Sequence, residues 1–319
     1  MKAPSQSVFP TLGQLLDAAE RRLSEAKVSF GHGTTNARDE AAWLVLWRLG
    51  RPLDLDLHAH AADPVAPGDA AAVRALIETR IRTRKPAAYL TGEAWLQGVP
   101  FFVDERVIVP RSFIAELIAA APQADPIDSW LGAHTRRVLD LCTGNGSLAV
   151  LAALAWPDVT VDASDLSTDA LAVAASNVAR HGLQERIRLL QSDGWAALRD
   201  RYDLILCNPP YVSRARMDAL PAEYRAEPAL ALDGGPDGGD DGMDFVRHLL
   251  AHALDHMNPD AVLVLEIGHE RVHFERAFPT LPVVWLRTSG GDDAVLLITR
   301  DALAVAQADL PPDPHRPTP

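Results

Sequence analysis

The sequence predicts an α/β protein built on a mostly parallel sheet, with a small helical domain and a β-hairpin before it. Two observations carry this prediction. From Arg136 onward, short apolar runs of strand length alternate with runs that have helical spacing. Before that point, from Thr11 to about Arg84, apolar residues recur three and four positions apart, which is typical of helices packed on one face.

Three helices are expected in this first region. Glycine and proline clusters divide it, because these residues interrupt helical spacing: Gly31 and Gly33 lie between the first two helices, and Pro67 and Gly68 precede the third. The apolar faces consist of Leu12, Leu15, Leu16, Ala19 and Leu23, then Ala41, Leu44, Leu46 and Trp47, then Val73, Leu76, Ile77 and Ile81.

A hairpin is expected in residues 94–110, where aromatic and β-branched residues surround Asp104 and Glu105. Helical spacing resumes over residues 114–121, and a stretch with Pro and Asp, residues 122–134, forms a connector. These features divide the chain into a helical domain (1–92), a hairpin with a connecting helix (93–121) and a larger sheet domain (122–300).

The alternation in the sheet domain is regular. Because its strand-like runs are continuously apolar, we expect a parallel sheet that helices cover on both faces. The last two runs are separated only by SGGDDA and can pair as an antiparallel edge. Strands are expected at 137–141, 159–165, 187–193, 202–207, 261–267, 283–288 and 294–300, helices at 149–156, 169–181 and 243–257, and a loose tail at 301–319.

Charge and composition exclude several classes of protein. Thirty Lys and Arg against 43 Asp and Glu leave the 319 residues with a net charge of −13, which disfavours direct nucleic-acid binding and suits a basic partner. The two cysteines, Cys142 and Cys207, cannot form a disulfide framework or a four-cysteine zinc site, so we expect a cytoplasmic protein. The longest apolar run has nine residues, too few for a membrane span, and the first 22 residues do not resemble a signal peptide.

The first chemical motif is DLCTGNG, residues 140–146, where a strand passes into a helix. Glycines at such a turn let the backbone approach a ligand, and Asp165, nineteen residues after Gly146 at the end of the next strand, can accept hydrogen bonds from ribose hydroxyls. The loop does not match the GxGxxG pattern, because Cys142 occupies the first glycine position. A tight turn without a ligand is therefore the alternative.

The second motif is NPPY, Asn208 to Tyr211, directly after the fourth predicted strand of the sheet. Ligands of open α/β sheets bind beyond the carboxyl ends of the strands. Two prolines fix the turn, so that the Asn208 side-chain carbonyl and the Pro209 main-chain carbonyl can both accept hydrogen bonds from one NH₂ group. Tyr211 can pack on a planar group. The motif therefore predicts a cradle for an amide or an aromatic amine.

DLCTGNG, Asp165, SDG (192–194) and NPPY together resemble the motifs of class I, S-adenosylmethionine-dependent methyltransferases, which have a Rossmann-like fold. The runs 37–50, 84–112, 223–235 and 242–250 narrow the resemblance to the protein-(glutamine-N(5)) methyltransferases. Within that family VPRSFIAELI, Cys142, YVSRARMDALPAEYRAEP and EIGHE are more similar to the branch that modifies large-subunit ribosomal protein L-three than to the release-factor branch.

The resemblance implies residue roles. The helical domain would recognise the protein substrate, and S-adenosylmethionine would be the cofactor. Asp165 would bind ribose, Asp193 and Gly194 would lie beside adenine, and Gly144 and Gly146 would face the methionine part. The implied catalytic residues are Asn208, Pro209, Pro210 and Tyr211, and the implied cofactor-binding residues are Asp140, Cys142, Thr143, Gly144, Asn145, Gly146, Asp165, Leu166, Asp193, Gly194 and Asn208.

Three rival functions stay open on the sequence: a glutamine methyltransferase of release factors, an adenine-N(6) methyltransferase of nucleic acids, and a non-catalytic ribosome-assembly factor. The net charge argues against the second, because such an enzyme needs a basic groove for phosphates. The presence of Asn208 and Asp165 argues against a non-catalytic ribosome-assembly factor, because such a factor would not need them.

Other motifs are interpreted as structural. HERVH, residues 269–273, matches the HExxH zinc pattern but follows a strand end directly, so we expect the first turn of a crossover helix and no catalytic metal. The Gly- and Asp-rich run 234–242 is expected to be a lid near the site. The basic cluster Arg80, Arg82, Arg84 and Lys85 is expected to be a solvated helix end, with contact to RNA or an acidic partner as the alternative.

Overall fold

The computed structural model describes residues 10–235 and 241–314. It consists of two compact units. We call residues 1–93 together with 221–226 the helical unit, and residues 94–220 together with 227–319 the sheet unit. Among the helices of the described residues, none combines the length and the apolar character that crossing a membrane requires.

The helical unit contains the three expected helices, α1 (Leu12–Glu25), α2 (Ala37–Arg48) and α3 (Pro67–Thr83), and a short α4 (Ala87–Thr91) that the sequence did not predict. Thr11 begins α1 with a capping box, in which its side chain accepts from the Gln14 amide and the Gln14 side chain accepts from the Thr11 amide. Pro67 and Gly68 lie in the first turn of α3, where proline is tolerated. Most residues of the predicted faces form the core, whereas Leu76 and Ile81 are half-buried against it and Trp47 is 39% exposed.

The expectation of a solvated basic helix end is wrong for Arg80. This residue is fully buried in the helical unit, where Nε donates to Glu40 Oε1 at 2.8 Å and Nη2 donates to the Ser29 carbonyl at 3.0 Å. Arg84, at the left-handed C-cap of α3, donates to the Ala26 carbonyl at 2.8 Å. Helical spacing places Arg80 on the buried face with Val73 and Ile77, and charge alone could not reveal this.

The expected hairpin exists, but its turn lies elsewhere. Strands β1 (Glu93–Leu96) and β2 (Val99–Phe102) are joined at Gln97 and Gly98, not near Asp104 and Glu105. Both turn residues have positive φ, 50° and 75°, as the two-residue turns that match strand twist require. The Asp104 carboxylate instead accepts from the Arg106 side chain just after the hairpin.

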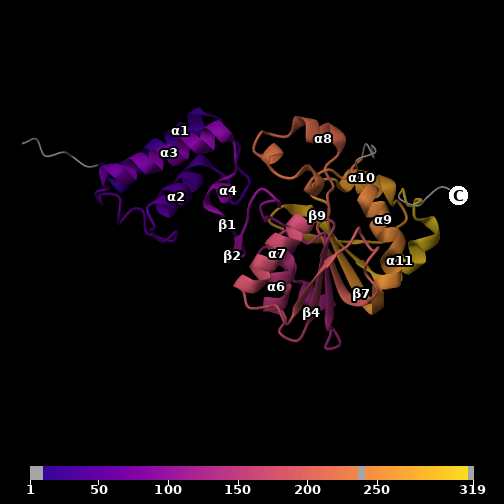
Figure 1. The fold of residues 1–319 in the computed structure, drawn as a ribbon. Helices are drawn as coiled ribbons and strands as arrows, with labels where there is room; N and C mark the ends of the chain where they lie inside the picture. The colour runs from indigo at the N-terminus through magenta and orange to yellow at the C-terminus, as the bar shows by residue number, and fades with distance from the viewer. Residues whose placement is uncertain (1–9, 236–240, 315–319) are drawn as a thin grey trace, which may run out of the picture. The chain divides into compact units, whose positions relative to one another are not determined.

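The sheet has seven strands in the order β5-β4-β3-β6-β7-β9-β8. Figure 1 labels β4, β7 and β9 of this sheet. Strands β3 to β7 are parallel to one another, β9 is antiparallel to β7, and β8 is the edge strand, antiparallel to β9. The predicted mostly parallel sheet is therefore confirmed. The bounds are β3 (Arg137–Leu141), β4 (Thr160–Asp165), β5 (Ile187–Gln191), β6 (Tyr202–Cys207), β7 (Met257–Glu266), β8 (Val284–Thr288) and β9 (Gly291–Thr299).

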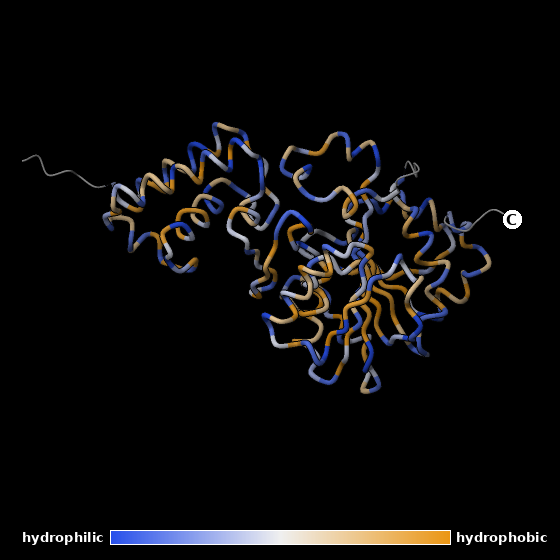
Figure 2. Tube along the Cα trace, viewed as in Figure 1, coloured by the Kyte–Doolittle hydropathy of each residue, from blue (hydrophilic) through white to orange (hydrophobic). Residues whose placement is uncertain are grey.

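Helices cover both faces of this sheet (Figure 1). Val138 of β3 belongs to one hydrophobic cluster and its neighbour Leu139 to the other, which explains why apolar residues occur at successive positions of the central strands and appear as a hydrophobic layer in Figure 2. One cluster contains residues of α5 (Ile114–Ile118), α6 (Ser147–Ala155) and α7 (Thr168–Arg180), and the other contains residues of α9 (Asp244–His252), α10 (Arg271–Ala277) and α11 (Arg300–Ala306).

The expectation of a loose tail from residue 301 is wrong for residues 301–309. Thr299 caps α11, and a 3-10 helix (Gln307–Asp309) follows it. Leu303 and Ala306, spaced three apart, are buried in the same hydrophobic cluster as the sheet residues, and Ala302 and Leu310 pack against it partly buried. Residues 315–319 lie outside the described residues.

Candidate active site

The sequence motifs converge at the carboxyl ends of the strands in the middle of the sheet. Leu141 pairs with Ser164 on one side and with Cys207 on the other, so β3, β4 and β6 end at the same level. There the sheet unit contains a cavity of about 340 Å³. Of the predicted site residues, Cys142, Gly144, Asp165, Leu166, Asp193, Gly194, Asn208 and Pro210 line this cavity.

The two glycines of the loop 140–146 have different roles: Gly144 faces the cavity, and Gly146 packs against a helix. Gly144 has φ +56°, and a Cβ on it would meet no atom within 4 Å, so its backbone is open to a ligand. A Cβ on Gly146 would lie 3.1 Å from the Ala174 side chain of α7. Gly146 therefore permits the close approach of α7 and does not line the cavity, which differs from the role that the resemblance implied.

Asp165 presents its carboxylate at the cavity wall. Oδ2 accepts from the Gly144 amide and Oδ1 from the Ser167 amide, each at 2.9 Å. Burial raises the pKa of this carboxyl, although these backbone donors oppose the shift. Each oxygen keeps a further lone pair, so the side chain can accept hydrogen bonds from a diol.

Asp140, in contrast, supports the loop from behind. Its Oδ2 accepts from Thr143 Oγ1 at 2.5 Å and from the Ala149 amide at 3.0 Å, which ties the loop to α6. Burial raises the pKa of Asp140 to about 7. Asp140, Thr143 and Asn145 are buried and are absent from the cavity lining, so the structure separates these three predicted cofactor residues from those that face the cavity.

The NPPY turn offers hydrogen-bond acceptors to the cavity and few donors. Asn208 is half-buried, and within the described part of the chain no residue is hydrogen-bonded to its side-chain amide. Pro209 and Pro210 have no N–H, so the main chain adds carbonyl oxygens only. Such a rim complements an NH₂ group, which has two protons to donate.

Pro209 and Tyr211 do not line the cavity itself. The Tyr211 ring packs on the turn after β7, since a Cβ on Gly268 would lie 2.7 Å from its Cε2 atom. Tyr211, the last residue of the NPPY turn, thus packs its ring at the end of strand β7, the neighbour of β6.

Several lining residues lie outside the predicted set. Phe245 in the first turn of α9 adds an aromatic ring, and Leu230 adds a large apolar side chain that is 55% exposed. The sequence signal for Phe245 is an aromatic residue three positions after the Gly- and Asp-rich run 234–242. Gly234 and Gly235 of the predicted lid also line the cavity, whereas residues 236–240 lie outside the described residues.

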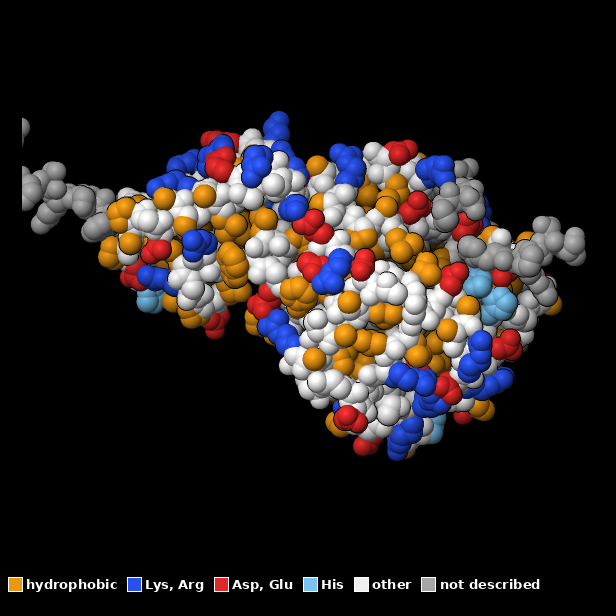
Figure 3. Space-filling view, in the orientation of Figure 1, with side chains coloured by type: hydrophobic (Ala, Val, Ile, Leu, Met, Phe, Trp, Pro, Cys, Tyr) orange, Lys and Arg blue, Asp and Glu red, His pale blue; other side chains and the backbone are white. Residues whose placement is uncertain are grey.

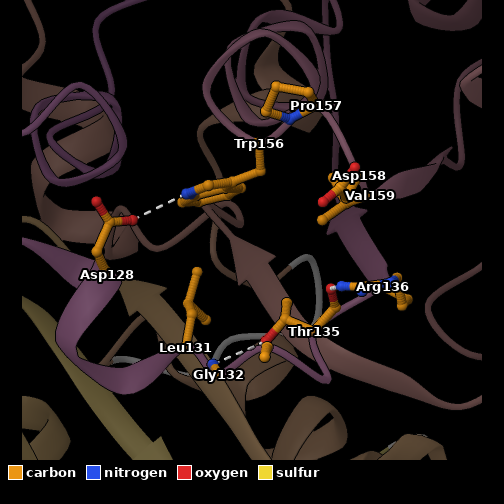
Figure 4. A pocket seen from close by; sticks show the side chains of 10 residues that line it. Asp128, Leu131, Gly132, Thr135, Arg136, Trp156, Pro157, Asp158 and Val159 are labelled. Atoms are coloured by element: carbon orange, nitrogen blue, oxygen red, sulfur yellow. Dashed lines mark hydrogen bonds between the residues drawn. The ribbon is translucent and has the colours of Figure 1, made fainter.

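A second pocket of about 310 Å³ lies where β3 and β4 begin, and Figure 4 shows its residues. The indole nitrogen of Trp156 donates to Asp128 Oδ1 at 2.8 Å, and the Thr135 hydroxyl oxygen accepts from the Gly132 amide. Because ligands of open α/β sheets bind at the carboxyl ends of the strands, this pocket at the amino ends is not the candidate active site.

The HERVH run does not form a zinc-binding helix. Helix α10 begins at Arg271, so His269 precedes it in a turn and does not share a helical face with His273. His273 Nδ1 lies 2.8 Å from Glu270 Oε2 instead. The expected first turn of a crossover helix is therefore confirmed.

The cavity fits the cofactor that the resemblance implies. An open glycine backbone, a carboxylate on the next strand and apolar walls are what the methionine part, the ribose and the adenine of S-adenosylmethionine require. Ser164 Oγ, also in the lining, is buried without a hydrogen-bond partner among the described residues.

Comparisons with known proteins agree with this geometry. Residues 14–92 match the model of the PrmC N-terminal domain, and residues 127–224 match that of the methyltransferase small domain. A ribosomal protein uL3 glutamine methyltransferase of Bordetella pertussis is 53% identical over 95% of this chain and 99% of its own length.

Proteins of the same description from Burkholderia pseudomallei and Neisseria meningitidis are 50% and 46% identical, each over 92% of this chain and 96% and 94% of their own lengths. The resemblance found in the motifs, including its branch, is thereby confirmed. The chain belongs to the family of ribosomal protein uL3 glutamine methyltransferases.

Proposed function

We propose that this protein transfers a methyl group from S-adenosylmethionine to the side-chain amide nitrogen of a glutamine in ribosomal protein uL3. The observation that carries the proposal is the NPPY turn at the wall of the candidate cofactor cavity, where Asn208 and Pro210 line the cavity and neither proline has an N–H. The names of the relatives supply the substrate protein.

The chemical difficulty is the nucleophile. The lone pair of an amide nitrogen is delocalised into its carbonyl, so the nitrogen attacks poorly. The Asn208 side-chain carbonyl and the Pro209 main-chain carbonyl accept one N–H each, which localises electron density on the nitrogen and aims it into the cavity. The bound cofactor supplies a methyl group on a positively charged sulfur.

The two acceptors also stabilise the positive charge that the nitrogen gains as the new N–C bond forms. Once it is methylated, the nitrogen is acidic and loses its proton to water. The protein therefore needs no strong base at this point, and the absence of His or Glu from NPPY agrees with that.

The positions of these residues around the cavity support the cofactor roles that we propose. Asp165 accepts from the ribose hydroxyls, Gly144 lets the methionine part approach, and Asp193 with Gly194 borders the adenine. Tyr211 lines the slot for the glutamine side chain.

Charge supports a protein substrate. On the face that Figure 3 shows, acidic and basic side chains are interspersed within each unit, whereas a nucleic-acid substrate would need a continuous basic groove. The net charge of −13 favours association with a basic ribosomal protein. In this proposal, the helical unit binds that substrate protein. Because ribosomal proteins are made in the cytoplasm, we infer that the enzyme acts there.

The experiment is a parallel incubation of the purified protein and radiolabelled S-adenosylmethionine with uL3, with a peptide-release factor and with nucleic acid. We expect label on uL3, mapped by mass spectrometry to one glutamine. Label on the release factor alone would retain the chemistry and refute the substrate, and label on nucleic acid alone would refute the amide cradle.

A further inference from the structure

A second cluster of chemistry-bearing side chains lies behind the cofactor cavity. His248 and His252 are four residues apart on α9 and therefore share one face of the helix, with their ring centroids 5.0 Å apart. Asp313, from the segment after α11, completes the group. Its carboxylate lies 3.2 Å from His248 Nδ1 and 3.0 Å from His252 Nε2.

The spacing of these atoms suits a metal ion. One ligand atom from each of the three residues lies within 4.8 Å of the others, and no other such group of His, Cys, Asp and Glu occurs in residues 10–235 and 241–314. Tetrahedral metal–ligand bonds of about 2.1 Å place ligand atoms about 3.4 Å apart. Two of the three separations, 3.0 and 3.2 Å, lie within a few tenths of an ångström of this value, and the third, between the two imidazole nitrogens, is at most 4.8 Å.

Exposure and ligand type narrow the class of ion. The Asp313 side chain is 7% exposed and that of His248 19%, whereas that of His252 is 41% exposed and gives a path from solvent. Two imidazoles and one carboxylate favour Zn²⁺ or Co²⁺ over Mg²⁺ or Ca²⁺, which prefer oxygen ligands alone. A water molecule would take the fourth position.

We propose that His248, His252 and Asp313 form a binding site for a divalent transition-metal ion, with Zn²⁺ as the best-fitting ion, that fastens the C-terminal segment to α9. The site borders the candidate cofactor cavity without belonging to it. A Cβ on Gly194 would lie 2.8 Å from His248 Nε2, so the other edge of the His248 ring faces a glycine of the cavity wall. An ion on Nδ1 would fix that ring.

The test uses tag-free, full-length protein freed of metal with a chelator. Zn²⁺ binding is measured by calorimetry, and Co²⁺ binding by its visible absorption. We expect one ion per chain, a visible spectrum typical of tetrahedral Co²⁺, and a higher Tm when Zn²⁺ is present.

His252→Ala and Asp313→Ala are each expected to weaken binding at least tenfold and to abolish the Tm shift. His58→Ala, which removes an exposed histidine of the helical unit, is expected to leave the metal affinity and the Tm shift unchanged. Because His252 is partly exposed, its variant keeps the test valid if Asp313→Ala disturbs the C-terminal segment. Absence of saturable binding in the wild type, or binding that both variants retain, would overturn the proposal.

Discussion

Arg80 Nη1 lies 3.4 Å from Glu223 Oε1, although 143 residues separate the two in the chain. Glu223 belongs to residues 221–226, which follow the NPPY turn in sequence yet are part of the helical unit. The chain thus leaves the sheet unit ten residues after Tyr211 and returns to it at Glu227. There, Arg111 Nη1 lies 2.6 Å from Glu227 Oε1. Ion pairs therefore hold the segment that follows the candidate catalytic turn at two residues, Glu223 and Glu227.

Replacing the buried cation at the first of these ion pairs should destabilise the helical unit. Arg80→Met leaves the buried carboxylates of Glu40 and Glu223 without their shared partner, and we expect a loss of about 3–5 kcal/mol in the free energy of unfolding. Urea titration measures it. Arg74→Met, at an exposed position of the same helix, is the control and should cost less than about 0.5 kcal/mol. Equal losses in both variants would refute the structural role of Arg80.

The stability of the protein should depend on pH through Glu266 at the end of β7. Three donors, Ser112 Oγ and the amides of Phe113 and Ile114, converge on its Oε2 atom, yet burial raises the pKa of Glu266 to about 7. Because this pKa lies above that of the unfolded chain, the folded state binds the proton more tightly. The stabilisation is complete below the unfolded pKa and is lost as the pH rises to about 7.

Glu266→Gln keeps one acceptor oxygen for these donors and cannot ionise. At pH 8 we expect the variant to be more stable than the wild type by roughly 3 kcal/mol, and at pH 5 by about 1 kcal/mol or less. Unfolding in urea at both pH values measures the difference. Glu275→Gln, at an exposed site of α10, serves as the matched control. A stability difference that does not change with pH would contradict the assignment.

Cofactor affinity should depend on the Asp165 carboxylate. Asp165→Asn removes the charge that the ribose hydroxyls are proposed to bind, which should weaken S-adenosylmethionine binding by about 1.5–3 kcal/mol, or roughly 10- to 150-fold. Since burial raises the pKa of Asp165, wild-type affinity should also fall as the pH is lowered through that raised value. Calorimetry tests both effects, with exposed Asp158→Asn as control. Undiminished affinity in Asp165→Asn would exclude the ribose contact.

The sequence predicted the sheet and the motif positions well because both depend on local pattern. Apolar runs of strand length that alternate with runs of helical spacing define β3, β4 and β6, and the parallel arrangement then brings Gly144, Asp165 and Asn208 to one edge. The sequence centres the hairpin on Asp104 and Glu105, whereas its turn lies at Gln97 and Gly98, whose positive φ values only the structure reveals.

Long-range features could not be predicted from local pattern. The burial of Arg80 depends on Glu223, far along the chain, and that of Leu303 depends on the sheet that α11 covers. The division of the glycine loop into cavity-facing Gly144 and packing Gly146 depends likewise on α7, which approaches at Ala174.

The central claim is that Asn208 holds the glutamine amide, and a single-turnover assay of Asn208→Ala tests it most directly. The account predicts that S-adenosylmethionine still binds while methyl transfer to uL3 falls at least about 100-fold, since one acceptor of the developing charge is lost. Asn208→Asp, which keeps acceptor oxygens at this position, should retain more activity than Asn208→Ala. Transfer at the wild-type rate in Asn208→Ala would contradict the account.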